Sequence, residues 1–246
     1  MDWLKQLIMG DRVIWMEKPL TGSGRALALA PHPDDPDAIA VTLRLLSLGG
    51  WDLTWVILTE AWSGVQDDFV GPSQVKKSQA REAEQRASAQ LFGLPESRLH
   101  FLRLAEDMRG NLDSTEINRQ CFFEFLTQMR PDLVLLPCRE DTNPSHRLTY
   151  AWFSEWAKNA KHLVVALGNE DPKTVQFQSR FEVHFGMETA NWKATLLECH
   201  RSQSVRNLAT RQMTFAERIL RVNRAVPGLA QGMHAERFQL EVWQPG

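Results

Sequence analysis

The chain has 246 residues, which is enough to bury a substantial core in one α/β domain or in two small ones. Hydrophobic residues make up 43% of the sequence and charged residues 24%, as is typical of globular proteins in water. The net charge of −2 lacks the basic footprint of nucleic-acid binding, and no apolar run reaches the ~18 residues of a membrane span, so we expect neither partner.

The first part of the chain alternates apolar strands with helices. Residues 26–30 (ALALA) are typical of a buried strand, and a helix is expected from Asp35 to the glycine pair at 49–50. Residues 52–59 (DLTWVILT) are rich in β-branched and aromatic side chains, which predicts a second strand. A helix over 73–91 ends at the stop signal that begins with Gly93, and a third strand is expected over 99–104.

The same alternation continues further along the chain. Residues 113–116 (DSTE) resemble a capping box, and the apolar spacing after them predicts a helix that ends at Arg130. Residues 132–138 (DLVLLPC) are typical of an interior parallel strand covered on both faces. A helix after His146 and an apolar run over 162–167 follow. From residue 169 the pattern weakens, and we expect a mixed region that ends in a strand over 238–243, whose antiparallel direction is left open.

This alternation predicts a Rossmann-like, doubly wound and mostly parallel sheet flanked by helices, in a single α/β domain over 1–246. In such a sheet, ligands bind at the carboxyl ends of the strands, near the point where the strand order reverses. The expected order 3-2-1-4-5 makes the first and fourth strands neighbours. Polar segments that follow these two strands should therefore meet.

Two such segments are present: residues 31–37 (PHPDDPD) after the first strand and residues 141–146 (DTNPSH) after the fourth. Imidazoles combined with a carboxylate suit Zn²⁺, Fe²⁺ or a similar ion with water in an open position. A metal-bound water with a spare carboxylate beside it can hydrolyse an amide. Asp34 and Asp35 are adjacent and cannot point the same way, so one can bind the metal while the other faces the water.

Each of these residues also has an ordinary structural explanation. Asp35 followed by Pro36 favours, taken alone, a helix N-terminus with Asp as the cap. Asp34 is also typical of a turn, His32 of a polar strand end, and His146 of a capping or surface position. One histidine and three aspartates within residues 32–37, at a strand end, favour the functional interpretation.

The segments PHPDD and D-x-N-P-S-H, each after an apolar strand, resemble the PIG-L/LmbE family of zinc-dependent N-acetylglucosaminyl deacetylases. Further stretches resemble the same family: 81–84 (REAE), 130–134 (RPDLV), 193–203 (KATLLECHRSQ) and 235–238 (AERF). The resemblance spans roughly residues 25–240. It implies His32, Asp35 and His146 as metal ligands and Asp34 as the general base. It also implies that Asp141 orients His146 or the base.

Three further residues are candidates for contact with the substrate. Arg81 falls where the resemblance implies an arginine near the substrate pocket. Trp62 follows the second strand, and two roles are open for it: its ring can stack under a sugar, or it can be a buried side chain that anchors the loop. His200 is a candidate for the pocket rim, with a polar helix end as the alternative.

The second motif departs from the family's pattern, because H-P-D-H is replaced by residues 143–146 (NPSH). Asn143 can donate a hydrogen bond to an oxyanion, but it cannot supply a proton as a histidine can. Ser145 removes a carboxylate that could partner a neighbouring imidazole. Residues 36–37 (PD) also replace the commoner Glu. Metal binding survives these changes, whereas efficient deacetylation is left in question.

The cysteines indicate the cellular compartment in which the protein works. Cys121, Cys138 and Cys199 lie far apart without a CxxC pair, which argues against a disulfide framework and favours a reducing, cytoplasmic setting. The start of the chain, with an acid at Asp2 and interrupted apolar stretches, does not resemble a signal peptide.

We therefore expect a cytoplasmic hydrolase that removes an N-acyl group, acetyl first of all, from an amino-sugar-like substrate such as an N-acylated sugar or sugar conjugate. One divalent metal is expected, Zn²⁺ before Fe²⁺. The alternative is a metal-binding family member with impaired or lost catalysis that acts as a binding or assembly protein. Asn143 and Ser145 favour that alternative, and the intact Asp34 counts against it. The sequence leaves open which molecule carries the acyl group, which metal binds, and whether the chain forms a homo-oligomer.

Overall fold

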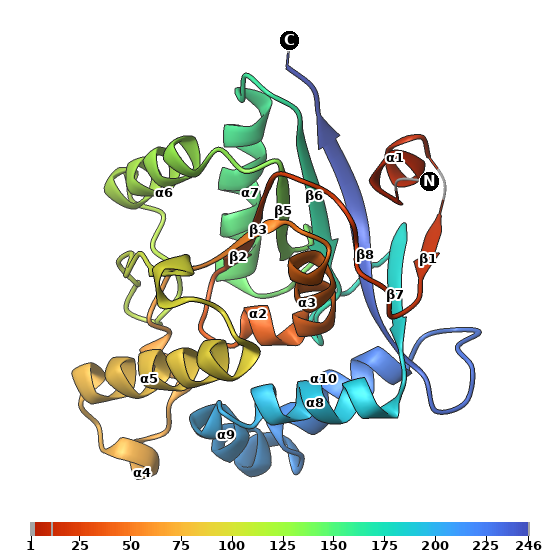
Figure 1. Cartoon of the computed structure of the whole chain (residues 1–246). Coiled ribbons are helices and arrows are strands. Elements are labelled where there is room, and N and C mark those ends of the chain that lie inside the picture. The colour runs from red at the N-terminus through yellow and green to blue at the C-terminus, as the bar shows by residue number, and fades with distance from the viewer. Residues whose placement is uncertain (1–2, 11, 246) are drawn as a thin grey trace.

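The computed structural model describes residues 3–10 and 12–245. Residues 1, 2, 11 and 246 of the predicted 1–246 domain lie outside the described residues, Asp2 among them. One eight-stranded sheet runs through the described part of the chain (Figure 1). In sheet order its strands are β1 (Val13–Trp15), β7 (Phe181–Phe185), β8 (His234–Trp243), β6 (Val164–Asn169), β5 (Leu133–Pro137), β2 (Arg25–Ala30), β3 (Asp52–Ile57) and β4 (Leu99–Phe101).

The central part of the sheet is parallel and has the predicted order. Strands β4, β3, β2, β5 and β6 lie side by side, which corresponds to the expected sequence 3-2-1-4-5. Ala28 of β2 pairs with Trp55 of β3 on one side and with Leu135 of β5 on the other. The late strand β8 is antiparallel to both β6 and β7. The predicted mostly parallel α/β fold is confirmed, and the direction left open for the last strand is antiparallel.

Helices cover both faces of this sheet (Figure 1). Because side chains alternate along a strand, Ala26 and Ala28 join a core with α3 and α8, whereas Leu27 and Leu29 join a second core with α6 and α7. The helices are α1 (Trp3–Ile8), α2 (Asp35–Ala38), α3 (Ala40–Leu48), α4 (Asp67–Val70), α5 (Gln74–Phe92), α6 (Glu116–Met129), α7 (Pro144–Lys158), α8 (Met187–Leu197), α9 (Arg201–Arg211) and α10 (Phe215–Arg224), with the short 3-10 helices η1 (Trp62–Gly64) and η2 (Glu96–Arg98).

Local capping explains the helix boundaries and corrects two of the predictions. Ser73 caps α5 with its side chain, and Gly93 ends that helix at φ 90°, as its sequence predicts. The predicted capping box over 113–116 is wrong, because Thr115 is the residue whose side-chain oxygen caps α6. The helix expected after His146 begins earlier, at Pro144, so His146 lies within its first turn.

Two further differences concern continuity. The helix predicted from Asp35 to the glycine pair is interrupted at Ile39, whose φ of −124° separates α2 from α3. The short strands β1 and β7 and the helices between β7 and β8 fall outside the predicted elements. Cys121, Cys138 and Cys199 are all free, as expected. Among the described residues, no helix combines the length and the apolar character needed to cross a membrane.

Candidate active site

The candidate site is built on the loop between β2 and α2, which is anchored at both ends. Thr59 donates from Oγ1 to the carbonyl oxygen of Pro31 at 2.8 Å. The backbone N–H of His32 donates to Oδ2 of Asp35, also at 2.8 Å. Asp35 is the first residue of α2, and the N-cap position belongs to Asp34, whose side chain makes no capping bond. The cap interpretation of Asp35 is therefore wrong, and its carboxylate turns back toward His32.

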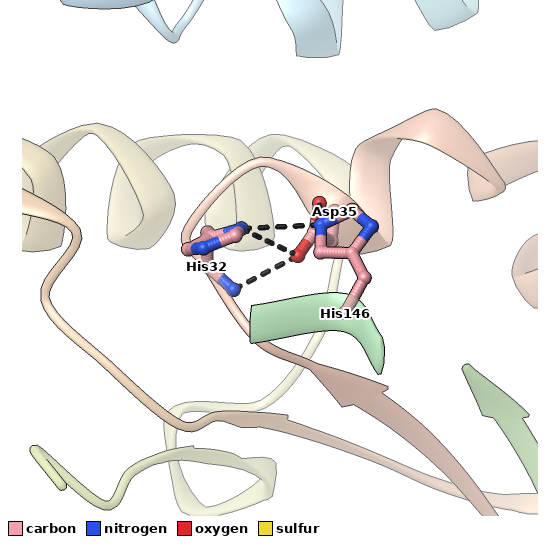
Figure 2. A group of neighbouring side chains, drawn as sticks. All are labelled: His32, Asp35 and His146. Carbon is pink, nitrogen blue, oxygen red and sulfur yellow. Dashed lines mark hydrogen bonds and ion pairs between the residues drawn. The ribbon is translucent and has the colours of Figure 1, made fainter. Parts of the chain in front are cut away.

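Three side chains converge beyond the carboxyl end of β2 (Figure 2). Nδ1 of His32 lies 3.4 Å from Oδ2 of Asp35, and Nε2 of His146 lies 3.4 Å from Oδ1 of Asp35. The two imidazole nitrogens are 3.2 Å apart. Ligand atoms at ~2.0–2.1 Å from a tetrahedral metal lie about 3.4 Å from one another, because a tetrahedron's edge is about 1.6 times its centre-to-corner distance. The chemistry and spacing of the three donors fit one such ion.

Asp141 holds the other side of the His146 ring. Its Oδ2 lies 2.8 Å from Nδ1 of His146, and its Oδ1 accepts the backbone N–H of Asn143 at 2.6 Å. Asp141, His146 and Asp171 form a second close group of potential ligands that shares His146 with the first. Histidines that bind a metal through one nitrogen commonly donate the other N–H to a carboxylate. The Asp141 contact therefore favours the first group, with Nε2 of His146 facing the ion.

The electrostatics of the first group suit metal binding. Burial lowers the pKa of His32 below its usual value. Burial raises the pKa of Asp35, but His146 and His32 outweigh it and hold that pKa well below its usual range. Burial also lowers the pKa of His146, yet Asp35 and Asp141 outweigh it and raise that pKa well above its usual value. A neutral His32 and an ionised Asp35 are the protonation states that bind a metal, whereas His146 has to release the proton on Nε2 when an ion binds there.

Asp34 is the spare carboxylate of the loop, and its backbone is strained. Its φ of 99° lies in the left-handed region, where residues other than glycine are uncommon. Gln85 accepts its backbone N–H at 2.8 Å through Oε1, and Nη1 of Arg81 lies 3.4 Å from its Oδ2. Arg81 also donates to the carbonyl oxygen of Pro33. Two residues of α5 therefore stabilise the conformation in which Asp34 lines the cavity.

The two departures in the second motif, Asn143 and Ser145, have structural partners. Asn143 caps α7, since its Oδ1 accepts the N–H of Ser145 at 3.0 Å. Ser145 is buried, and its Oγ accepts the backbone N–H of Leu112 at 3.0 Å. In the described part of the chain, no acceptor bonds Nδ2 of Asn143, which leaves its N–H groups available to a ligand in the cavity that this residue lines.

These side chains surround a cavity of about 230 Å³. Six of the predicted site residues line it: His32, Asp34, Asp35, Arg81, Asn143 and His146. Asp141 lies behind His146 and does not reach the wall. Further parts of the wall come from Ala61, Ser63 and Gly64 around η1, from residues 109–111, from Asp171 and Lys173, and from helices α9 and α10.

Comparison with known protein families gives one match. The family described as GlcNAc-PI de-N-acetylase, PIG-L, matches residues 27–157, which is more than half of the chain. The chain belongs to the PIG-L family. The predicted family is confirmed, and with it the enzyme class for which the family is named, a hydrolase of amide bonds. The match includes His32, Asp34, Asp35 and His146.

The similarity to solved structures extends beyond residues 27–157. The N,N'-diacetylchitobiose deacetylase of Pyrococcus horikoshii has a TM-score of 0.71 and 18% identity, over 88% of this chain and 83% of that one. A zinc-inhibited form of teicoplanin deacetylase has a TM-score of 0.62 and 15% identity, over 89% and 98%. The 4-carboxy-2-hydroxymuconate hydratase of Pseudomonas putida has a TM-score of 0.61 and 14% identity, over 88% and 95%. No curated protein matches the chain.

These likenesses establish the PIG-L fold, and a hydratase among them means that the fold alone does not fix the reaction. The argument for function therefore depends on the side chains.

Two of the residues predicted to contact the substrate do not line the cavity. His200 is fully buried, and its Nε2 lies 2.7 Å from Oδ2 of Asp37, so the rim assignment is wrong and His200 belongs to the support beneath the loop. Trp62 is half-buried in η1, whereas its neighbours Ala61 and Ser63 line the cavity. The alternative of a loop anchor describes Trp62 better than a sugar platform does.

Several residues at the PIG-L site were missed from the sequence. Gln85 and Asp37 support the loop, and nothing in the local pattern distinguishes Gln85 from any other polar residue of α5. Asp171 lines the cavity, and burial raises its pKa to about 6. Arg206 and Arg218 line the cavity from helices that the sequence did not resolve. The high density of arginine over 201–224 was the signal available for them.

Proposed function

We propose that this PIG-L protein is a metal-dependent amidase that removes an N-acyl group, acetyl first of all, from an amino-sugar-like substrate. The observation that carries the proposal is the convergence of His32, Asp35 and His146 at the spacing of a tetrahedral ligand set, with Asp34 on the same cavity. Support for the substrate class comes from the family's name and from a neighbour named as a diacetylchitobiose deacetylase.

His32, Asp35 and His146 would hold one divalent ion. A divalent metal at that position supplies a water of lowered pKa and polarises the amide carbonyl. Zn²⁺ suits two imidazoles and a carboxylate, and Fe²⁺ suits them as well. One neighbour is named as a zinc-inhibited form, so the choice between the two ions is left to experiment.

The chain's own residues carry the remaining roles. Asp34 takes the proton of the attacking water and later returns it to the departing amine. Asn143 donates from Nδ2 to the oxyanion that develops on the carbonyl. Asp141 keeps the His146 ring oriented. The main role of Arg81 is to hold the Asp34 carboxylate in place, rather than to bind the substrate. The cytoplasmic location and a homo-oligomer stay predictions.

The decisive experiment measures amine release from a panel of N-acetylated sugars and sugar conjugates, using protein reconstituted with Zn²⁺ or Fe²⁺. We expect chelation to abolish release and to lower Tm modestly without unfolding the chain, because the ligands lie on a preformed sheet. Loss of the fold on chelation would mean that the metal is structural.

Two variants test the roles. Asp34→Asn should lower turnover by about 10²–10⁴ with metal content unchanged, and Asp68→Asn, an exposed carboxylate on α4, is its matched control. Asn143→Ser keeps a capping oxygen but removes the amide donor, and should lower turnover by about 10²–10³. A wild-type rate that Asp34→Asn leaves untouched refutes the mechanism. Bound metal without amine release from any N-acyl substrate supports the binding-protein alternative instead.

A further inference from the structure

The lining of the cavity is rich in arginine. Helices α9 and α10 contribute Arg206, Arg211 and Arg218, which we call the arginine wall, and two loops contribute Arg109 and Lys173. With Arg81 they make six lining cations, against the three lining carboxylates Asp34, Asp35 and Asp171. The whole chain has a net charge of −2, so this excess of positive charge is local to the cavity.

Helix α9, which carries Arg206 and Arg211, is anchored near its start. Near the start of α9, Ser202 donates from its backbone N–H and its hydroxyl to the buried carboxylate of Glu84 on α5, at 2.7 and 2.6 Å. One turn on, Gln203 donates to the carbonyl oxygen of Gly64 at 3.1 Å. Arg206 lies against Gly64 as well, and a Cβ at that glycine would come within 3.4 Å of its Nη1. The guanidinium of Arg206 is therefore positioned against the active-site side of η1.

Within the part of the chain that the structure describes, Arg206, Arg211 and Arg218 form no ion pair, whereas Arg237 elsewhere pairs with Glu170. Burial and the charges of Arg211 and Arg81 lower the pKa of Arg206. Burial lowers the pKa of Arg218 and Arg211 adds to that effect, whereas Asp171, Asp34 and Asp141 oppose it. Arg211 thus repels both Arg206 and Arg218, and an anion between these guanidinium groups would relieve that repulsion.

We propose that Arg206, Arg211 and Arg218 form a subsite for an oxyanion carried by the substrate, so that the N-acyl amino sugar bears a phosphate or a carboxylate. This inference rests on the proposed function, because it names the substrate class of the same site. Guanidinium groups bind phosphate and carboxylate through paired N–H donors, and arginine is preferred over lysine where such geometry matters. The anionic end would lie on the α9–α10 wall while the acyl group faces the metal group.

The test measures binding separately from catalysis. Calorimetric titrations of metal-free protein would compare N-acetylglucosamine, N-acetylglucosamine 1-phosphate, N-acetylglucosamine 6-phosphate and the carboxylate-bearing N-acetylmuramate. We expect at least one anionic sugar to bind about 10-fold or more tightly than neutral N-acetylglucosamine, with an advantage that shrinks as salt is raised. The preferred anionic sugar distinguishes phosphate from carboxylate.

The matching variant is Arg206→Gln/Arg218→Gln, which should remove this advantage and leave the affinity for the neutral sugar unchanged. Arg201→Gln is the control, since Arg201 is exposed on the same helix α9 and does not line the cavity. Equal binding of neutral and anionic sugars, or an advantage that survives the double substitution, overturns the subsite. Amine release from a neutral sugar would still support the proposed function, so the two failures are distinguishable.

Discussion

Gln85 links α5 to the active-site loop through both ends of its amide, which makes it a sharp test of how the loop is held. Its Oε1 accepts the backbone N–H of Asp34 at 2.8 Å, and its Nε2 donates to Oδ2 of Asp37 at 3.0 Å. Gln85 and Asp37 are both fully buried. Gln85→Met keeps the length of the side chain but removes both bonds. Leaving the buried N–H of Asp34 unpaired costs about 1–3 kcal/mol, whereas Oδ2 of Asp37 loses one partner and keeps Nε2 of His200 at 2.7 Å, so the free energy of unfolding should fall by about 1–4 kcal/mol.

The same substitution should also affect catalysis. Asp34 keeps its φ of 99° partly through Gln85, and release of that strain moves the carboxylate away from the cavity. We expect amine release to drop by at least ~10-fold with metal content unchanged, since misplacement of a catalytic group by about 1 Å costs about 10²-fold.

Urea unfolding followed by circular dichroism measures the change in stability. Gln90→Met, on the exposed face of α5, is the control, and its free energy of unfolding should lie within about 0.5 kcal/mol of the wild-type value. Equal stability of the two variants would refute the loop-support argument. A destabilised Gln85→Met with full turnover would refute the positioning role.

Two further predictions concern buried charges. Lys193 is fully buried and donates to Glu236 at 2.7 Å. Lys193→Met should cost about 3–5 kcal/mol, because Glu236 keeps its hydrogen bonds from Val41 and Thr42 but loses the cation beside it. The double variant Lys193→Met/Glu236→Gln should recover part of the loss in a urea double-mutant cycle. Burial raises the pKa of Glu106 from 4.5 to about 7, so the unfolded chain releases this proton at lower pH than the folded one, and stability falls as pH rises from about 4.5 to 7. Glu106→Gln should remove that decline, worth roughly 1 kcal/mol after solvent screening, and an unchanged Tm difference between pH 5 and pH 8 would contradict it.

The central sheet was predictable because its signals are local. Continuous apolar runs mark β2, β5 and β6, and Gly93 stops α5 by its own conformation. The edge of the sheet has no comparable signal. Strand β1 has three residues, and Glu182 of β7 is buried because it pairs with Arg12, 170 residues away in sequence. A buried acid with a distant partner cannot be recognised from a pattern of neighbours.

The convergence of His32, Asp35 and His146 was predictable for a related reason, whereas its surroundings were not. Adjacent parallel strands end together, so His32 and His146 had to meet once the strand order was known. His200 was misassigned because its partner Asp37 is 163 residues away and a local polar cluster looks the same at a rim as beneath a loop. The arginine wall depends on where α9 packs, and Glu84 decides that from α5.

The replacement of histidine by Asn143 has a consequence for the proton that the departing amine needs. Asn143 is fixed at both ends: Asp141 accepts its backbone N–H, and its own Oδ1 caps α7 at Ser145. Its amide can therefore stabilise an oxyanion without reorganising, but an amide does not supply a proton near neutral pH. Under the proposed mechanism Asp34 must carry the proton from the water to the amine by itself. Asp34→Asn should then be more damaging than Asn143→Ser, and the pH dependence of turnover should follow the ionisation of a carboxylate rather than that of an imidazole at position 143.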